Sequence, residues 1–529
     1  MKVDLILLTN TKAVNLQWPH GKVTCVTPFV KNLQKAIDDI NEDGSDWTLI
    51  WDEMFGIPPD EIIKRLITRQ VDIWHSGLKA GVSELPAFMN TVDPTWMYNK
   101  NASIDVEHTN FRVSFRCLLI KTELLKSIPI IIDGFKSIEI AGVAAGYALI
   151  KSGAIIRYTP ELLEEILPVN KSLLYDEWVF ARKFYSSKWH GWLLIARKSL
   201  LHNLSLYFNT ANIVPLSIQP CIHKSDVPPQ AKYQTVSVLA PTLDRYEYLL
   251  AELQQLSEQT ILPLEVLITD QTPGERRQRI NTEEFPRLEI RIFPQQELGQ
   301  CIAWNKLLEE ARGEYVLFLG DDADNITTDF IERLLSTMQV YNADMVASNV
   351  IEAGIKAKYK PPYLSIADTF PITLIKRKLL LQTGFMDMFY NRNIRADHDL
   401  AMRCHLHGAL MLYNPAATIY HHRAPMGGLR SHKARVVTNY MVKHSLSKFT
   451  VPTSSELYLI KKFYNAEQFR AFVRIKFLNQ LFIEGGITRK FFKTLYFILK
   501  GPGLRKKYKK NLAIANIAIN ENTAGNRQA

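Results

Sequence analysis

The sequence predicts an α/β protein in which two similar domains stand in tandem and a basic helical tail follows. Three observations favour this fold class: strands alternate with helices, stretches of the first half recur in order in the second, and positive charge gathers near the C-terminus. At 529 residues the chain is also too long for one ordinary core. We therefore expect a first domain over residues 1–221, a linker over 222–234, a second domain over 235–432, a helical segment over 433–512 and a disordered tail over 513–529.

The second domain shows the alternation most clearly. The β-branched run "TVSVLAPT" precedes a helix-like pattern, "LEVLITD" and "LEIRIF" predict two more strands, and "CIAWNKLLEEA" predicts another helix. The apolar run "VLFL" then ends in "GDDAD", which places three aspartates just past a buried strand. Ligands of parallel sheets bind at the carboxyl ends of strands, where Thr242, Asp270 and the aspartates would lie.

The first half repeats this pattern. "DWTLIWDEMFGIPPDEIIKRL" aligns without gaps with "YVLFLGDDADNITTDFIERLL", which sets Asp52 opposite Asp321 and Glu53 opposite Asp322. "AGVAAGYALIKSGA" matches "ADHDLAMRCHLHGA", with Gly142 opposite Asp397, and "ARKFYSSKW" is paired with "MVKHSLSKF". Because the copies differ most where carboxylates appear, we expect the first domain to be structural or acceptor-binding.

The second half resembles the family-2 glycosyltransferases, inverting enzymes of the GT-A fold, over roughly Thr235 to Pro425. The resemblance rests on "VSVLAPTLDR", the strand ending at Asp270, "LGQCIAWN", the acidic strand end and "RADHDLAMRCHLHG". Two positions depart from the family's pattern: Gly320 and Ala396 stand where the family usually has acidic residues. The resemblance implies two tandem GT-A-like domains, Rossmann-like folds for nucleotide-diphosphate sugars, of which the first is a degenerate copy.

The resemblance also implies a donor site. Thr242, Asp244, Asp270 and Asp321 would bind the nucleotide, while Asp322, Asp324 and His422 would hold Mn²⁺ or Mg²⁺. A hard divalent cation neutralises a leaving diphosphate, and carboxylate oxygens are its preferred ligands. Two alternatives stay open: the acids could merely cap the helix that starts near Thr328, and His421 could take the place of His422.

Asp397 is the candidate catalytic base by the same resemblance. An inverting transfer requires a group that accepts the proton of the acceptor hydroxyl on the face opposite the diphosphate. "RADHDLAMRCHLHG" reads as a helix with Asp397 at its N-terminal end. The alternative is that Asp397, or Asp399 beside it, only complements the helix dipole.

Residues 441–510 contain sixteen Lys and Arg against three Glu, a net of +13, whereas the rest of the chain sums to −2. On a helix, Arg489, Lys493 and Lys500 fall on one face, and Phe491, Leu495 and Leu499 fall on another. Such a helix suits an anionic membrane surface, although packing against its own domain is an equal alternative. No nucleic-acid-binding motif accompanies the charge, so we expect no nucleic acid partner.

The sequence thus favours a metal-dependent inverting glycosyltransferase that moves a sugar from a nucleotide-diphosphate sugar to a glycan or lipid-linked acceptor. Five scattered cysteines without a CxxC pair, and no signal-peptide pattern, favour the cytoplasm, with a peripheral place on the inner face of the membrane. A nucleotidyltransferase is less favoured, because "APTLDRYEYL" lacks the glycines of a phosphate loop. A non-catalytic glycan- or membrane-binding scaffold is the alternative from another class.

Overall fold

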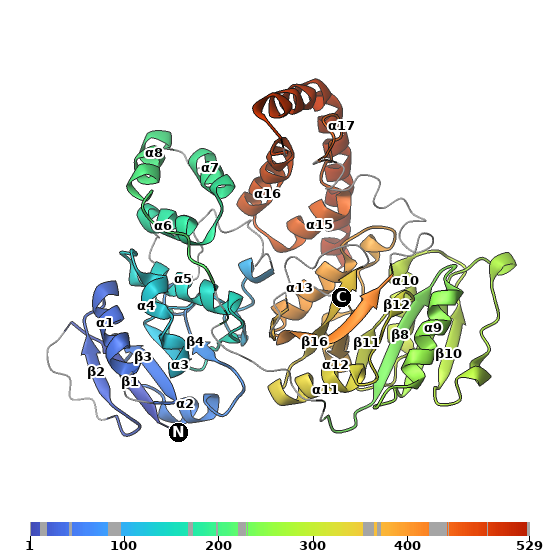
Figure 1. Cartoon of the computed structure of the whole chain (residues 1–529), viewed down its shortest axis with the longest axis horizontal. Helices are drawn as coiled ribbons and strands as arrows, with labels where there is room; N and C mark the ends of the chain where they lie inside the picture. Colours follow the sequence, from blue (N-terminus) through green and yellow to red (C-terminus); the bar gives the residue numbers. More distant parts are fainter. Residues whose placement is uncertain are drawn as a thin grey trace.

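The computed structural model describes residues 2–10, 18–41, 45–82, 97–167, 173–196, 199–218, 220, 229, 231–352, 364–367, 372–422, 442, 444–483 and 485–525. Figure 1 shows two β-sheets side by side, each with its own helices, and a group of helices that stands away from both sheets near the C-terminal end of the chain. The predicted α/β class is confirmed.

The N-terminal sheet has seven strands in the order β2-β1-β3-β6-β4-β7-β5. Its strands are β1 (Val3–Leu8), β2 (Val23–Val26), β3 (Trp47–Asp52), β4 (Ile73–His75), β5 (His108–Thr109), β6 (Cys117–Lys121) and β7 (Ile156–Tyr158). The helices of this half are α1 (Val30–Asn41), α2 (Asp60–Leu66), α3 (Thr122–Leu125), α4 (Ile128–Ile132), α5 (Ile138–Lys151), α6 (Leu174–Phe184), α7 (Ser187–Ala196) and α8 (Leu200–Asn209).

The C-terminal sheet runs β10-β9-β8-β11-β15-β13-β16-β12, with β14 also paired to β16. Its strands are β8 (Val236–Thr242), β9 (Glu265–Asp270), β10 (Ile290–Pro294), β11 (Tyr315–Phe318), β12 (Ala323–Asp324), β13 (Met345–Glu352), β14 (Ser365–Ile366), β15 (Thr373–Lys376) and β16 (Met411–His421). Its helices are α9 (Tyr246–Ser257), α10 (Gln300–Glu310), α11 (Phe330–Tyr341), α12 (Arg377–Thr383) and α13 (Ala396–Leu406).

The two sheets share one topology. Strands β1 to β7 correspond, in chain order, to β8, β9, β11, β13, β14, β15 and β16. Each corresponding pair of neighbours runs in the same relative direction: for example, β3–β6 and β11–β15 are both antiparallel, and β4–β7 and β13–β16 are both parallel. The C-terminal sheet adds β10 at one edge and the short β12 at the other.

An ion pair occurs at the same place in both sheets. In the N-terminal half, Lys121 donates to Asp72 at 2.9 Å, and Asp72 also accepts from the backbone N–H of Ile155 at 2.7 Å. In the C-terminal half, Lys376 donates to Asp344 at 2.9 Å, and Asp344 accepts from the N–H of Leu410 at 2.9 Å. The carboxylate of Asp72 thus connects the end of β6 to the start of β7. The carboxylate of Asp344 connects the end of β15 to the start of β16 in the same way.

These equivalences correct the predicted alignment of the acidic strand ends. Backbone bonds from Trp47 to Lys2 and from Tyr315 to Thr235 occupy the same place in the two sheets. Trp47 therefore matches Tyr315, one residue away from the gapless pairing, so that Asp52 falls opposite Gly320. By the same count Glu53 matches Asp321, and the exposed Met54 stands where the C-terminal half has Asp322.

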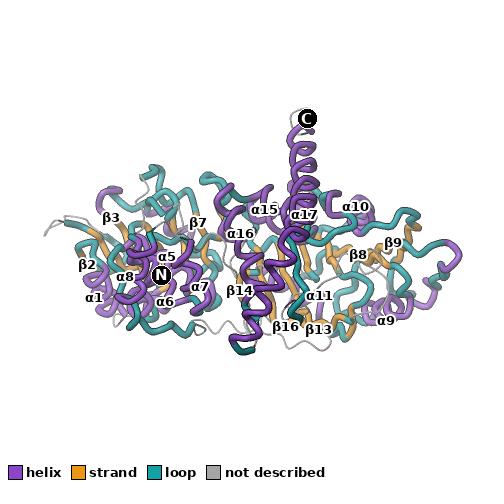
Figure 2. The backbone as a smooth tube through the Cα atoms, turned by 90° about the horizontal axis from the view of Figure 1, so that it is seen from above, coloured by secondary structure: helices purple, strands orange, loops and turns teal. Residues whose placement is uncertain are grey.

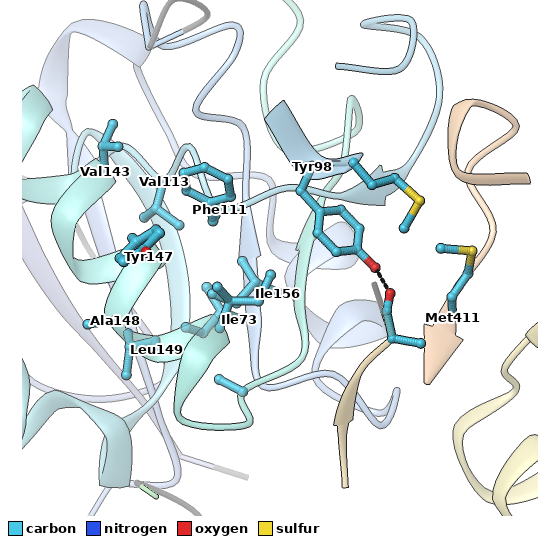
Figure 3. Close-up of a cluster of buried hydrophobic side chains, with 14 of the residues drawn as sticks. Ile73, Tyr98, Phe111, Val113, Val143, Tyr147, Ala148, Leu149, Ile156 and Met411 are labelled. Carbon is cyan, nitrogen blue, oxygen red and sulfur yellow. Dashed lines mark hydrogen bonds between the residues drawn. The ribbon is translucent and has the colours of Figure 1, made fainter. Parts of the chain in front are cut away.

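The two halves touch through the C-terminal end of α13. Arg157 donates to the carbonyl of Gly408 at 2.8 Å, and the ring of His405 donates to the carbonyl of Lys100 at 2.9 Å. Figure 3 shows Tyr98 reaching across the boundary, where its hydroxyl donates to the carbonyl of Ala367. These bonds link α13, which carries the candidate base, to the N-terminal domain.

Three helices, α15 (Ser454–Phe463), α16 (Ala466–Leu478) and α17 (Ile487–Gly525), follow the second sheet. Helix α15 starts with a capping box between Thr453 and Glu456. Helix α17 continues to Gly525, so the helical segment runs past residue 512, where we expected it to end. The stretch after 512 is rich in alanine and packs Ala515 and Ala518 inward, which extends the helix.

The duplication includes two of these helices. Helix α6 ends at "KFY", Lys183 to Tyr185, and α15 ends at "KFY", Lys462 to Tyr464. Tyr185 bonds back to Ala181 at 2.9 Å, and Tyr464 bonds back to Ile460 at 3.0 Å. The stretch "RKFYSS" therefore matches "KKFYNA" and not "MVKHSLSKF", with which we paired it and which falls partly outside the described residues.

Candidate active site

The acidic strand end lies where β8 and β11 finish. Gly320 has a φ of 107°, and this left-handed turn carries Asp321 and Asp322 back under the loop that follows β8. Both aspartates are buried: Asp321 is 6% exposed and Asp322 is 8% exposed. Two buried negative charges side by side require a positive partner.

Arg245 supplies that positive charge. It precedes α9, and its Nη1 lies 2.8 Å from Asp321 Oδ1 and 2.9 Å from Asp322 Oδ2. One guanidinium nitrogen thus bridges both carboxylates. Arg245 ends the motif "APTLDR", and we assigned it no role from the sequence, although a cation in the loop after the first strand of this domain is a signal for a partner of the acidic strand end.

Burial raises the pKa of Asp321 to about 6, against the lowering effect of Arg245. Glu252 of α9 lies beneath the pair, fully buried, and burial followed by the repulsion of Asp321 holds its pKa well above the usual range. Glu252 Oε2 accepts from the N–H of Ala323 at 3.4 Å. Three carboxyl groups thus gather at this strand end, and burial disfavours the ionised form of Asp321 and of Glu252.

Two histidines reach the same place from β16. Strand β12 pairs antiparallel with β16, which sets Ala323 opposite His421. His421 Nε2 lies 3.0 Å from Asp322 Oδ1, and His422 Nε2 lies 2.8 Å from Asp324 Oδ2. Both candidate histidines therefore lie beside the aspartates: the ring of His421 contacts the carboxylate of Asp322, whereas His422 donates its backbone N–H to the carbonyl of Asp322 at 2.9 Å and turns its ring to Asp324.

The predicted cation ligands are only partly assembled. Among the residues that the structure describes, no group of three or more His, Cys, Asp and Glu side chains is placed to hold a metal ion. Asp324 turns to Gln255, whose amide donates at 2.7 Å, and to His422. Asp321, Asp322 and His421 nevertheless have the donor chemistry of a divalent cation site, and both carboxylates converge on one positive group, so they fit a cation if Arg245 moves aside.

The predicted nucleotide residues line the neighbouring strand ends. Asp270 ends β9 and accepts from the hydroxyl of Tyr246 at 2.7 Å and from the N–H of Thr272 at 2.9 Å. Asp244 has a φ of 57° and pairs with Arg276 at 2.9 Å. Thr242, at the end of β8, is buried. Asp270 therefore already has two donors, which stabilise the loops that surround the strand ends.

Asp397 occupies the first turn of α13. Its side chain is 47% exposed, and one carboxylate oxygen lies 2.9 Å from His398 Nδ1. The other ring nitrogen, His398 Nε2, lies 2.7 Å from Arg395 Nη1. Although desolvation acts to raise it, the bond to His398 lowers the pKa of Asp397, so the group is ionised at neutral pH.

Arg395 precedes α13 with a φ of 93°, an uncommon conformation for a residue with a side chain. The turn it makes aims the start of the helix and is supported from the tail, since Arg395 Nη2 lies 3.5 Å from Glu456 Oε1 of α15. Strained backbone of this kind persists where surrounding contacts hold it.

Asp399 has a structural role. It is fully buried, accepts from Arg403 at 2.8 Å, and pairs with Lys462 of α15 at 2.7 Å. Lys462 also pairs with Asp387 at 2.8 Å. The tail therefore fixes the N-terminal end of α13, while the N-terminal domain fixes its C-terminal end.

Residues 237–407 match the family model described as glycosyl transferase family 2, which confirms the resemblance predicted for the C-terminal half. No curated protein matches the chain. Among solved structures, S. aureus TarS in complex with UDP-GlcNAc is 14% identical, with 48% of this chain and 69% of that chain covered and a TM-score of 0.33. Mannosyltransferase PcManGT from Pyrobaculum calidifontis, in complex with GDP-Man and Mn²⁺, is 14% identical, with 55% and 87% covered and a TM-score of 0.34.

Proposed function

Because the chain contains a glycosyltransferase domain of family 2, we propose that it transfers a sugar, with inversion, from a nucleotide-diphosphate sugar to a hydroxyl group. The acceptor is a glycan or lipid-linked oligosaccharide of a surface polysaccharide. The observation that best supports this proposal is the convergence of Asp321, Asp322, Arg245 and His421 at the strand ends within the matched family region and just after it. Arg245 neutralises the buried aspartates through a flexible side chain. Such an arrangement suits a site in which a metal cation takes the place of the arginine.

The donor lies against the carboxyl ends of β8, β9 and β11. Asp270 and Thr242 bind the nucleoside, and Asp244 with its partner Arg276 borders the same loop. Asp321, Asp322 and His421 would hold Mn²⁺ or Mg²⁺, with Asp324 and His422 beside them. When bound, the cation supplies positive charge to the leaving diphosphate.

Asp397 is the base of the transfer. The acceptor oxygen bonds to the anomeric carbon, the bond from that carbon to the diphosphate oxygen breaks, and the acceptor proton passes to an oxygen of Asp397. His398 keeps the carboxylate oriented through its 2.9 Å contact, and Arg395 keeps His398 in place. The half-exposed position of Asp397 leaves room for an acceptor.

The N-terminal domain is a degenerate copy without a second transfer site. Gly142 aligns with Asp397, and a Cβ added there would lie 2.6 Å from the carbonyl oxygen of Val113. Asp52 is paired with Arg116, which also binds Glu139 at 2.9 Å. We assign this half to holding α13 and to acceptor binding.

We also place the protein peripherally at the inner face of a membrane. The described helices include none that is long and apolar enough to cross a bilayer. The basic tail supports a location at a membrane. The described cysteines, Cys25, Cys117, Cys301 and Cys404, form no disulfide, which supports the cytoplasmic side of that membrane.

The test is incubation of the full chain with a panel of UDP-, GDP- and dTDP-sugars, with Mn²⁺, Mg²⁺ or EDTA. We expect hydrolysis or transfer from one donor class and its loss in EDTA. If no donor is consumed and calorimetry detects no nucleotide binding, the scaffold alternative replaces the enzyme. If turnover survives EDTA, Arg245 and not a metal ion neutralises the negative charge of the leaving diphosphate.

A further inference from the structure

Helix α17 presents a mixed set of side chains on its inward face. Lys493 is fully buried, and its ammonium donates to the carbonyls of Val442, Ser445 and Lys448 at 3.1, 2.7 and 2.8 Å. Arg489 donates to the carbonyl of His444 at 3.1 Å. Three acceptors satisfy all three N–H groups of a lysine, so this buried charge is fully paired.

The cations on this face of the helix bind the protein itself. Lys500 completes the set by donating to the carbonyl of Ser447 at 2.7 Å. The segment 444–448 lies along this side of the helix and uses its backbone oxygens to hold Arg489, Lys493 and Lys500. The predicted grouping of Arg489, Lys493 and Lys500 on one face is confirmed, and this face packs against the backbone of the protein itself, as one of the two alternatives from the sequence has it.

The opposite face of α17 is apolar and open to solvent. Its large side chains are Ile487, Phe491, Phe492, Leu495, Ile498 and Leu499, each at least 41% exposed, with Ile487 at 85%. At 100° per residue these positions fall within an arc of about 140° over roughly 18 Å of helix. A soluble helix normally turns such a stripe toward its own core.

The same face becomes basic after Pro502. Arg505, Lys506, Lys509 and Lys510 occupy the same arc as the apolar residues, and all four are exposed. Helix α17 contains a single acidic residue, Glu521, well beyond this stretch. The outward face thus carries an apolar zone, residues 487–499, followed by a basic zone, residues 505–510.

We propose that this outward face of α17 binds the surface of an anionic lipid bilayer. The apolar zone lies at the boundary between headgroups and acyl chains, and the basic zone contacts the anionic headgroups. Charge complementarity selects this occupant, because the zone next to the apolar stripe is uniformly positive. This face of α17 is the part of the protein that contacts the membrane in the location proposed above. The proposal rests on that location and not on the transfer chemistry.

Figure 1 shows α16 and α17 near the middle of the molecule, standing out above the two sheets, and Figure 2 shows the same helices from above. The N-terminal half offers a comparison: α8 exposes Leu201 at 83% and Phe208 at 70%, and the ten residues of this helix include no Lys or Arg.

Flotation of the full chain with vesicles tests the proposal, using phosphatidylcholine alone or with 30% phosphatidylglycerol. We expect binding only to the anionic vesicles. Replacing Arg505, Lys506, Lys509 and Lys510 with Gln should lower the partition coefficient by about 600-fold, since each of the four cations contributes about fivefold near an anionic surface. Phe491→Ser with Leu499→Ser should lower it at least tenfold, whereas the control Leu201→Ser with Phe208→Ser should leave it unchanged.

Equal binding to neutral and anionic vesicles, or no loss in the α17 variants, would overturn the proposal. So would a dimer in analytical ultracentrifugation that the Phe491→Ser, Leu499→Ser variant converts to monomer, because a second copy would then cover the stripe. Sugar transfer to a water-soluble acceptor without vesicles should be the same in all these variants. Failure of the transferase proposal is thus distinguishable from failure of this one.

Discussion

At the aligned positions of α5 and α13, the N-terminal half has Gly142 packed against the backbone of Val113, whereas the C-terminal half has Asp397 half exposed. At the ends of β3 and β11, the first half has the exposed Met54 where the second has the buried Asp322. Strand order and direction are the same in both. One topology therefore carries different side chains at the equivalent helix start and strand end, and carboxylates occupy both places only in the C-terminal half.

The difference extends to how each half holds its last helices. Lys183 and Lys462 are aligned, but Lys183 donates to the backbone carbonyls of Ile130 and Ile131, whereas Lys462 pairs with the carboxylates of Asp387 and Asp399. Asp399 lies on the helix that carries Asp397. In the C-terminal half, the attachment of the tail is thus connected to the candidate base.

Removal of the candidate base should have the largest effect. Asp397→Asn keeps the shape of the side chain but not its basicity, so kcat should fall by about 10²- to 10⁴-fold while donor binding persists. Steady-state kinetics and calorimetry with the donor found active measure both quantities. Removal of the acids at the strand end of the other half, Asp52→Asn with Glu53→Gln, should leave kcat per folded molecule within about twofold. An unchanged rate in the first variant would place the base elsewhere.

Replacement of the aligned lysines, Lys462 and Lys183, should lower the free energy of unfolding by different amounts. Lys462→Met leaves the buried Asp399 with Arg403 as its cation, and we expect the free energy of unfolding to fall by about 3 kcal/mol. Lys183→Met removes only bonds to backbone carbonyls, and we expect a loss of about 1 kcal/mol. Urea denaturation of both variants measures the difference. Equal losses would show that the carboxylate attachment of the tail has no special weight.

A smaller effect concerns pH and the boundary between the halves. Burial lowers the pKa of His405 and of His75 to about 4, against an ordinary value of 6.5. The unfolded chain therefore binds more protons between pH 6.5 and 4, and the free energy of unfolding should fall as pH decreases through this range, by about 1 kcal/mol per histidine between pH 6.5 and 5.5. His405→Gln should flatten this slope in thermal denaturation. A slope unchanged by the substitution would contradict the assignment.

Part of this arrangement follows from sequence patterns. The repeats identified the duplication of "AGVAAGYALIKSGA" and "ADHDLAMRCHLHGA", which α5 and α13 reproduce with glycines of positive φ, Gly153 and Gly408, at their ends. Patterns of apolar residues also located the acidic strand end correctly. These features are local, so a window of sequence contains them.

Other features depend on contacts between distant segments. The one-residue shift at Asp52 became visible only through backbone bonds between neighbouring strands. Arg245 is 76 residues from Asp321, so its role could not be read from its own surroundings. The orientation of α17 depends on carbonyls of residues 444–448, because periodicity shows that a helix has two faces but not which one meets the protein.

The number of donor molecules bound per chain tests the central claim, that one of two like-folded halves holds the site, most directly. Isothermal titration with the active nucleotide sugar and Mn²⁺ should give one site per chain, with binding lost in Asp322→Asn and retained in Glu53→Gln. Two sites per chain, or binding that survives Asp322→Asn and disappears in Glu53→Gln, would contradict the account.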